Sequence, residues 1–201
     1  MSRKVLLSTA YLPPLEYMAE IKKSDEVIIE LEENYRKQTY RNRCYINSAD
    51  KPQFLSVPVY LGSVHKTLVK DLRIDYTKRW QQVHLGALRA SYGLSPYFIY
   101  YFEIFEKIIS SRKEFLVDLN TELLEAILKM MKCERSITFT SAFTVPGEKE
   151  NDLRYSISPK NSSEYRPKNY IPAFTPGTDY LKGLSIADLV FNTGPDALIY
   201  L

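Results

Sequence analysis

The sequence predicts a single α/β domain with a mixed, mostly N-terminal sheet, a helical middle third and a C-terminal segment that docks back onto them. Three observations indicate this fold class. Short β-branched and apolar runs come early in the chain, apolar residues recur at helical spacing from Trp80 to Met131, and residues 197–201 are again apolar. A chain of 201 residues suits one domain over residues 1–201, and it can bury a core without disulfides.

The first 30 residues predict a parallel pair of strands. Lys4 to Thr9 is a short apolar run, and Val27-Ile28-Ile29 is β-branched. Between them, Pro13-Pro14 precedes apolar residues at helical spacing, and the helix is expected to end before Ser24-Asp25. A strand, a short helix and a second strand at this spacing indicate a crossover connection.

Residues 32–74 predict a hairpin and one further extended piece. A polar stretch leads into Cys44-Tyr45-Ile46, residues 47–52 have turn chemistry, and Gln53 to Val59 is extended again. The hairpin loop is therefore longer than two residues. Leu68 to Ile74 alternates in polarity and is expected to be extended.

The middle third predicts three helices. The first runs from Trp80 to Tyr92 and ends at Gly93. Ser95-Pro96 is expected to open an aromatic helix through Ile109, and Ser111-x-x-Glu114 is the pattern of a capping box for the third. The apolar face of this third helix consists of Leu116, Leu119, Leu123, Leu124, Ile127, Leu128 and Met131.

The last third predicts a strand, a long loop and a docked helix. Ile137 to Val145 has strand character, and the polar stretch from Gly147 to Tyr170 is expected to be a surface loop. Ser185-x-x-Asp188 predicts another capping box, and Gly194-Pro195 ends that helix. The apolar end from Ala197 to Leu201 is expected to dock rather than to extend into solvent.

Composition argues against several classes of partner. The net charge is +3 and the basic clusters lie beside acidic runs, so we expect no nucleic-acid partner. No apolar run has the length of a membrane span and the amino end lacks a signal segment, which predicts a cytoplasmic protein. Two distant cysteines, Cys44 and Cys133, and two histidines make a metal site unexpected, and no cofactor motif is present. The oligomeric state is left open.

The strongest candidate binding segment contains Tyr35, Lys37, Arg41, Asn42 and Arg43. Guanidinium groups form bidentate bonds with planar anions, so this stretch could hold a phosphate or a carboxylate. The predicted ligand is an anionic small molecule such as a nucleotide-linked sugar or an activated acyl donor. The alternative is a solvated edge whose charges are balanced by the neighbouring glutamates.

His84 is the candidate catalytic residue, because histidine is the natural general base near neutral pH. A histidine on the apolar face of a helix is, however, more often a hydrogen-bonded core residue than a catalytic one. Thr9, Tyr11 and Asp25 lie near the ends of the first strand-helix unit, where ligands bind in open α/β sheets, although Asp25 could also serve a turn or a cap. Cys44 falls on the apolar side of its strand, which indicates an inert core thiol.

Several segments together form the pattern of one protein family. The most distinctive is Glu33 to Cys44, and the tail contributes Leu184 to Asn192 with Gly194-Pro195. The other segments, in chain order, are Ser8 to Tyr17, Leu55 to Val59, Trp80 to His84 and Tyr92 to Phe98. Over nearly its whole length the chain resembles the WbqC-like family, and its tail resembles the Bacteroidetes-type branch. Many members have Gln-Pro where this chain has Thr9-Ala10.

The resemblance implies a function in polysaccharide (O-antigen) biosynthesis. It implies a transferase that moves an aminoacyl or acyl group onto an activated amino sugar, and it carries no catalytic residues over to this chain. The alternative is a non-catalytic binding or assembly protein that recognises a glycan precursor or a partner enzyme. In that case the aromatic helix from Tyr97 to Phe105 would supply the contact surface.

Overall fold

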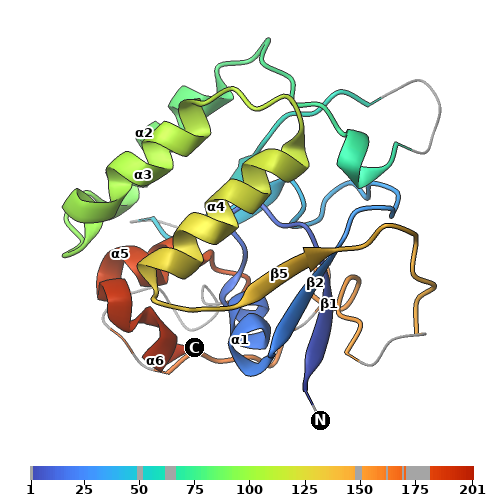
Figure 1. Cartoon of the computed structure of the whole chain (residues 1–201). Coiled ribbons are helices and arrows are strands. Elements are labelled where there is room, and N and C mark those ends of the chain that lie inside the picture. Colours follow the sequence, from blue (N-terminus) through green and yellow to red (C-terminus); the bar gives the residue numbers. More distant parts are fainter. Residues whose placement is uncertain are drawn as a thin grey trace.

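A three-stranded parallel sheet in the computed structural model combines two amino-terminal strands with a third strand that follows the central helices (Figure 1). The structure describes residues 2–48, 52–61, 67–147, 151–161, 163–168, 170 and 182–201. The strands are β1 (Lys4–Ser8), β2 (Glu26–Glu30) and β5 (Ser136–Phe139), in the order β1-β2-β5. Helix α1 (Leu15–Lys23) connects β1 to β2, so the predicted parallel pair with a crossover is confirmed.

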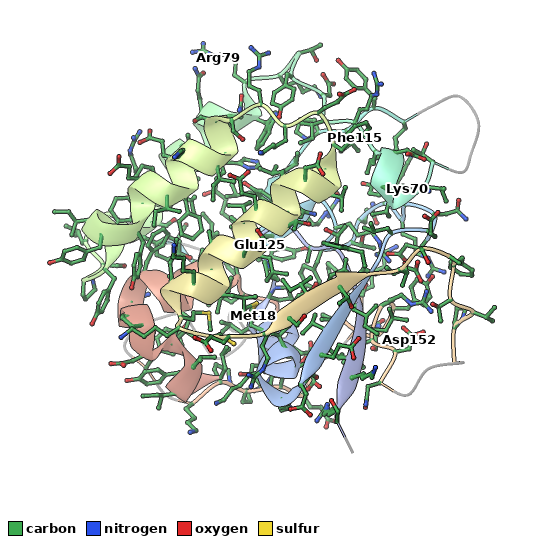
Figure 2. All side chains as sticks on the ribbon, viewed as in Figure 1. Met18, Lys70, Arg79, Phe115, Glu125 and Asp152 are labelled. Atoms are coloured by element: carbon green, nitrogen blue, oxygen red, sulfur yellow. The ribbon has the colours of Figure 1, made fainter. Side chains whose placement is uncertain are left out.

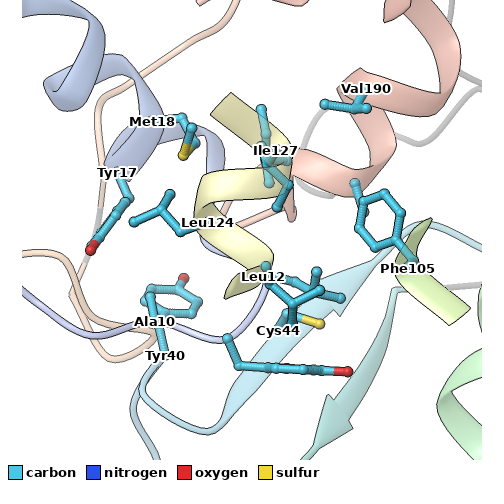
Figure 3. Packing of buried hydrophobic residues seen from close by; sticks show 14 of the residues in the cluster. Ala10, Leu12, Tyr17, Met18, Tyr40, Cys44, Phe105, Leu124, Ile127 and Val190 are labelled. Atoms are coloured by element: carbon cyan, nitrogen blue, oxygen red, sulfur yellow. The ribbon is translucent and has the colours of Figure 1, made fainter. Parts of the chain in front are cut away.

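Alternate residues of the sheet enter one hydrophobic core. Val5 pairs in register with Val27, and all four of Val5, Leu7, Val27 and Ile29 belong to the core. Because side chains alternate along a strand, these four lie on the same face. Figure 3 shows helices far apart in the sequence contributing to this core; the labelled side chains include Met18, Phe105, Leu124, Ile127 and Val190.

The predicted hairpin is formed by β3 (Arg43–Ile46) and β4 (Gln53–Ser56), which pair antiparallel. Cys44 and Ile46 are buried while Arg43 is half-buried, which confirms one apolar and one polar side.

The predicted extended piece from Leu68 to Ile74 is wrong in its centre. Val69–Asp71 forms a 3-10 helix, and isolated bridges lie on either side of it. The backbone N–H groups of Val69 and Lys70 donate to the carbonyls of Glu33 and Leu31. Because these N–H groups bond to the loop after β2, they do not form the hydrogen bonds of a β-strand pair.

The three central helices are confirmed as α2 (Trp80–Tyr92), α3 (Phe98–Ser110) and α4 (Leu116–Met130). The two predicted caps are wrong. The N-cap residues of α3 and α4 are Tyr97 and Phe115, while Ser95 Oγ donates to Asn192 Oδ1 and Ser111 Oγ donates to the Ile108 carbonyl.

The polar stretch after β5 is not simply a surface loop. Leu6 donates to the Asn151 carbonyl and Leu153 donates to the Leu6 carbonyl, so residues 151–153 bind the outer edge of β1. This pairing carries Arg154 into the interior, where it is 2% exposed. The surface-loop prediction is therefore wrong for residues 152–154, whereas Asn151 is exposed.

The carboxyl-terminal segment consists of α5 (Ile186–Thr193), a 3-10 turn at Gly194–Asp196 and α6 (Ala197–Tyr200). Ser185 caps α5 by accepting from the Ala187 N–H, as predicted, but the predicted capping box is not completed, because the Ser185 N–H donates to the Tyr45 carbonyl and not to Asp188. Lys22 Nζ donates to the carbonyls of Leu198 and Leu201, both at 2.7 Å, which confirms that the end is docked. Among the helices of the described residues, none combines the length and the apolarity that a membrane crossing requires.

Candidate functional site

The carboxyl edge of the parallel sheet is the candidate site. Ser8 and Glu30 end β1 and β2 and are register partners. Ligands of open α/β sheets bind outside this edge. Residues 33–43 and residues 151–155 both contact it, because Arg41 donates to Ser8 and Ser8 donates to the Arg154 carbonyl. Figure 2 shows Asp152 beside β1, where it forms a bridge with Leu6. We call the group Ser8, Glu30, Glu33, Arg41, Asp152, Arg154 and Tyr155 the carboxyl-edge cluster.

Arg154 is held in the cluster by two carboxylates. Its Nη1 donates to Glu30 Oε2 at 2.8 Å, while its Nε and Nη2 donate to the two oxygens of Asp152 at 2.9 and 2.6 Å. The side chains of Arg154 and Glu30 are fully buried. Thr140 Oγ1 and the Thr144 N–H also donate to Glu30, so both of its oxygens are satisfied. A buried charge must be paired and hydrogen-bonded in this way to be tolerated.

Arg41 forms the second buried pair. Its Nε and Nη2 donate to the two oxygens of Glu33 at 2.9 and 2.6 Å, and the same Nη2 donates to Ser8 Oγ at 2.6 Å. Ser8 Oγ in turn donates to the Arg154 carbonyl. The end of β1 therefore links the two arginines, and the carboxylates fix the orientation of both guanidinium groups.

Tyr155 is the point at which three guanidinium groups meet. The Cζ atoms of Arg36, Arg154 and Arg41 lie 3.8, 5.4 and 6.0 Å from its ring centroid. Cations within about 6 Å of an aromatic centroid are attracted by the ring. Burial raises the pKa of Tyr155, and Glu33 raises it further, while the three arginines lower it.

Neither buried arginine uses all of its guanidinium N–H groups in hydrogen bonds with the described residues. A guanidinium has five N–H groups, and in the described part of the chain the side chains of Arg41 and Arg154 each make three hydrogen bonds to protein atoms. Both residues line a small cavity of about 10 Å³ together with Ser8, Thr9 and Tyr40. A space of this size holds about one water molecule, so a larger ligand must bind at its mouth.

Asn120 links Thr9 to the backbone of Arg41, two of the residues predicted to bind a ligand. Asn120 Nδ2 donates to Thr9 Oγ1 at 3.0 Å and to the Arg41 carbonyl at 2.8 Å. Asn42 Nδ2 donates to the Val57 carbonyl and so fastens this segment to the end of the hairpin.

The other predicted residues of this segment are more accessible. Tyr35 is half-buried; burial raises the pKa of its hydroxyl, and the charges of Arg43 and Arg41 lower it. Lys37 is exposed. The Arg43 Cζ lies 5.6 Å from the Phe54 ring centroid, on the half-buried side of the hairpin.

His84 and Tyr11 form a buried pair away from solvent. The Tyr11 hydroxyl and His84 Nδ1 are 2.9 Å apart, and the Trp80 and His84 ring centroids are 5.1 Å apart. Burial lowers the pKa of His84 to about 4, and a hydrogen bond with the Ser56 backbone opposes this shift. The imidazole is therefore neutral near pH 7, and its surroundings are those of a core histidine.

Asp25 lies at the opposite end of the sheet from the cluster. It precedes β2, and its carboxylate accepts from the Arg3 N–H at 2.8 Å. The expectation that this turn lies at the ligand-binding edge is not met, because the loop between α1 and β2 leads into the amino ends of parallel strands. The alternative role of Asp25, as a residue that stabilises the turn before β2, agrees with this geometry.

The comparison with protein families gives a match over almost the entire chain. The model of the WbqC-like protein family matches residues 9–200. The chain belongs to the WbqC-like protein family. This WbqC-like protein is also similar to the uncharacterized protein Rv1507c of Mycobacterium tuberculosis. The two are 25% identical over an alignment of 233 residues, which covers 100% of this chain and 98% of that protein. No solved structure matches the chain.

Sequence reasoning missed most of the charged residues of the cluster. Glu30 and Glu33 carry a usable signal, because acidic residues directly after a β-branched run fall at the carboxyl end of a strand. Asp152, Arg154 and Tyr155 carry no such signal. They reach the site only because residues 151–153 pair with β1.

Proposed function

We propose that this WbqC-like protein is a transferase that moves an acyl or aminoacyl group onto an activated amino sugar in cell-surface polysaccharide biosynthesis. The anionic part of its substrate binds at the mouth of the carboxyl-edge cluster. The observation that carries the proposal is the convergence of Arg36, Arg41 and Arg154 on the ring of Tyr155.

The cluster has the chemistry of an anion-binding site. Guanidinium groups held in place by buried carboxylates offer their remaining N–H groups without a further ordering cost, and they match the geometry of phosphate oxygens. Nucleotide-linked sugars and coenzyme-linked acyl donors both carry phosphate groups. Arg36, Lys37 and Arg43 add positive charge on the accessible side.

The transfer itself needs an uncharged amine. The amine nitrogen forms a bond to the donor's carbonyl carbon, the bond from that carbon to the leaving group breaks, and the amine loses a proton. His84 is the proton acceptor predicted from the sequence. Its burial and its low pKa favour a structural role, so its catalytic role stays a prediction to be tested by substitution.

A non-catalytic binding protein is the second candidate function. Ile99 and Tyr100 of α3 are 80% and 69% exposed, which gives this helix an apolar surface suited to a partner enzyme.

The experiment that separates the two functions is a search for product. The protein is incubated with nucleotide-linked amino sugars and with acyl-coenzyme A or aminoacyl donors, and mass spectrometry detects the mass added to the sugar. Product with the wild type and with Arg79→Gln, but not with Arg36→Gln, supports the transferase. Binding of the sugar without any product supports the binding protein, and the absence of both refutes the proposed site.

A further inference from the structure

An apolar groove lies between α3 and α4, two helices that run side by side in Figure 1. Its volume is about 590 Å³, which is within the range of small-molecule sites. The floor of the groove is formed by Tyr101, Ile104, Ile108, Ala126, Met130 and Pro195.

The rim of the groove is predominantly basic. Lys107, Lys129 and Lys132 line it together with Glu122 and Glu125. Glu122 is neutralised by Lys113 at 2.8 Å, whereas none of the three rim lysines has an ion pair within the described part of the chain. Glu125, labelled on α4 in Figure 2, is the remaining acidic group of the rim. Three lysines against one unpaired carboxylate leave a positive rim beside an apolar floor.

The apolar surface continues past one end of the groove. The Tyr97 ring stacks on the Tyr101 ring with centroids 6.1 Å apart, and Tyr100 follows on the exposed side. A Cβ on Gly194 would lie 2.4 Å from the Tyr97 ring, so this ring sits directly against the turn before Pro195. The aromatic side chains therefore extend the apolar surface at the end where Lys132 and Pro195 line the groove.

We propose that this groove binds a single-chain amphiphile with an anionic phosphate end. The alkyl chain lies along the floor, and the phosphate lies at Lys129 and Lys132. The floor spans Tyr101 to Ile108 on α3, about 10 Å at 1.5 Å rise per residue, which suits a medium-length chain and is short for a partner helix. The site uses none of the residues of the carboxyl-edge cluster, so it stands independently of the proposed transferase.

Calorimetric titration with decyl phosphate, below its micelle concentration, tests the proposal on the full chain. Decanol and inorganic phosphate serve as the two halves of the probe. The expected result is that decyl phosphate binds at least about tenfold more tightly than either half, because only it uses both floor and rim. Equal binding of decanol would refute the role of the lysines. The absence of decyl phosphate binding would refute the site.

Substitutions locate the binding. Ala126→Phe fills the floor and Ile104→Glu places a charge on it; each should weaken decyl phosphate binding by about tenfold or more. Ile104 is 38% exposed, so its replacement keeps the test valid if Ala126→Phe does not fold. The double variant Lys129→Glu and Lys132→Glu should weaken decyl phosphate binding and spare decanol, whereas Lys78→Glu should change neither. Unchanged affinity in folded Ile104→Glu protein would overturn the proposal.

Discussion

The Tyr11 hydroxyl is hydrogen-bonded to His84 Nδ1 at 2.9 Å, and both side chains are buried. This contact joins the loop after β1 to helix α2. The sequence indicates His84 as a candidate catalytic base. In the structure His84 packs between these two elements and also contacts the ring of Trp80.

The Tyr11–His84 pair predicts a stability effect at acidic pH. Burial lowers the pKa of His84 from 6.5 to about 4 in the folded chain, so folding favours the neutral ring. The resulting contribution to the free energy of unfolding is on the order of 3 kcal/mol. It is fully present above pH 6.5 and is lost as the pH falls through 4. Urea unfolding between pH 7 and pH 4 should show a shallower loss of stability in His84→Gln than in the wild type. Equal pH profiles together with lost turnover would instead support a catalytic His84.

Asp188 predicts the opposite pH dependence. Desolvation raises its pKa from 3.8 to about 7, while hydrogen bonds from Tyr170, Asn192 and Tyr92 partly offset the shift. The folded state therefore retains a proton that the unfolded state has released. The associated stability is present below pH 3.8 and is lost as the pH rises to about 7. Asp188→Asn should flatten the melting temperature between pH 5 and pH 8, and a wild-type profile in this variant would contradict the assignment.

The buried ion pairs predict that one-sided substitutions are costly. Arg154→Met leaves Glu30 and Asp152 without their cation, and we expect a loss of about 3–5 kcal/mol in the free energy of unfolding. Adding Glu30→Gln to this variant should recover part of the loss, because one uncompensated charge is removed. Urea titration of the single and double variants measures both, and additive losses would contradict a direct pairing.

Two glycines predict opposite effects of the same substitution. Gly194 ends α5 with φ +58°, and a Cβ there would lie 2.4 Å from the Tyr97 ring, so Gly194→Ala should cost about 1–3 kcal/mol. Gly86 lies inside α2 with open space around its Cβ position, and Gly86→Ala should stabilise by about 1 kcal/mol. Thermal unfolding measures both variants, and a stabilising Gly194→Ala would show that the turn does not need its conformation.

Local patterns predicted the elements well because each depends on nearby residues. The strands β1, β2, β3 and β4 and the three central helices follow from β-branched runs and helical spacing. The face of α2 is predicted less well. Helical spacing from Trp80 and His84 places Val83 on the apolar face, but Val83 is 59% exposed while Leu85 is buried. Hydrophobicity fixes a helical stripe only to within about one position, and tertiary packing decides the rest.

The candidate site was predicted only in part. The segment around Arg41 was identified because its polarity is local, but its burial against Glu33 was not. The contribution of Arg154 depends on a backbone pairing between residues 151–153 and β1. That pairing spans most of the chain, and no local residue pattern encodes it.

The central claim is that Arg36, Arg41 and Arg154 around Tyr155 bind an anionic substrate, and calorimetry with uridine diphosphate glucosamine tests it most directly. Arg36 is exposed, so Arg36→Gln should keep the fold; it should weaken binding about tenfold through the loss of one charged hydrogen bond. Arg79→Gln, which removes an exposed arginine at α2, should bind like the wild type. Identical affinities for Arg36→Gln, Tyr155→Leu and the wild type would contradict the account.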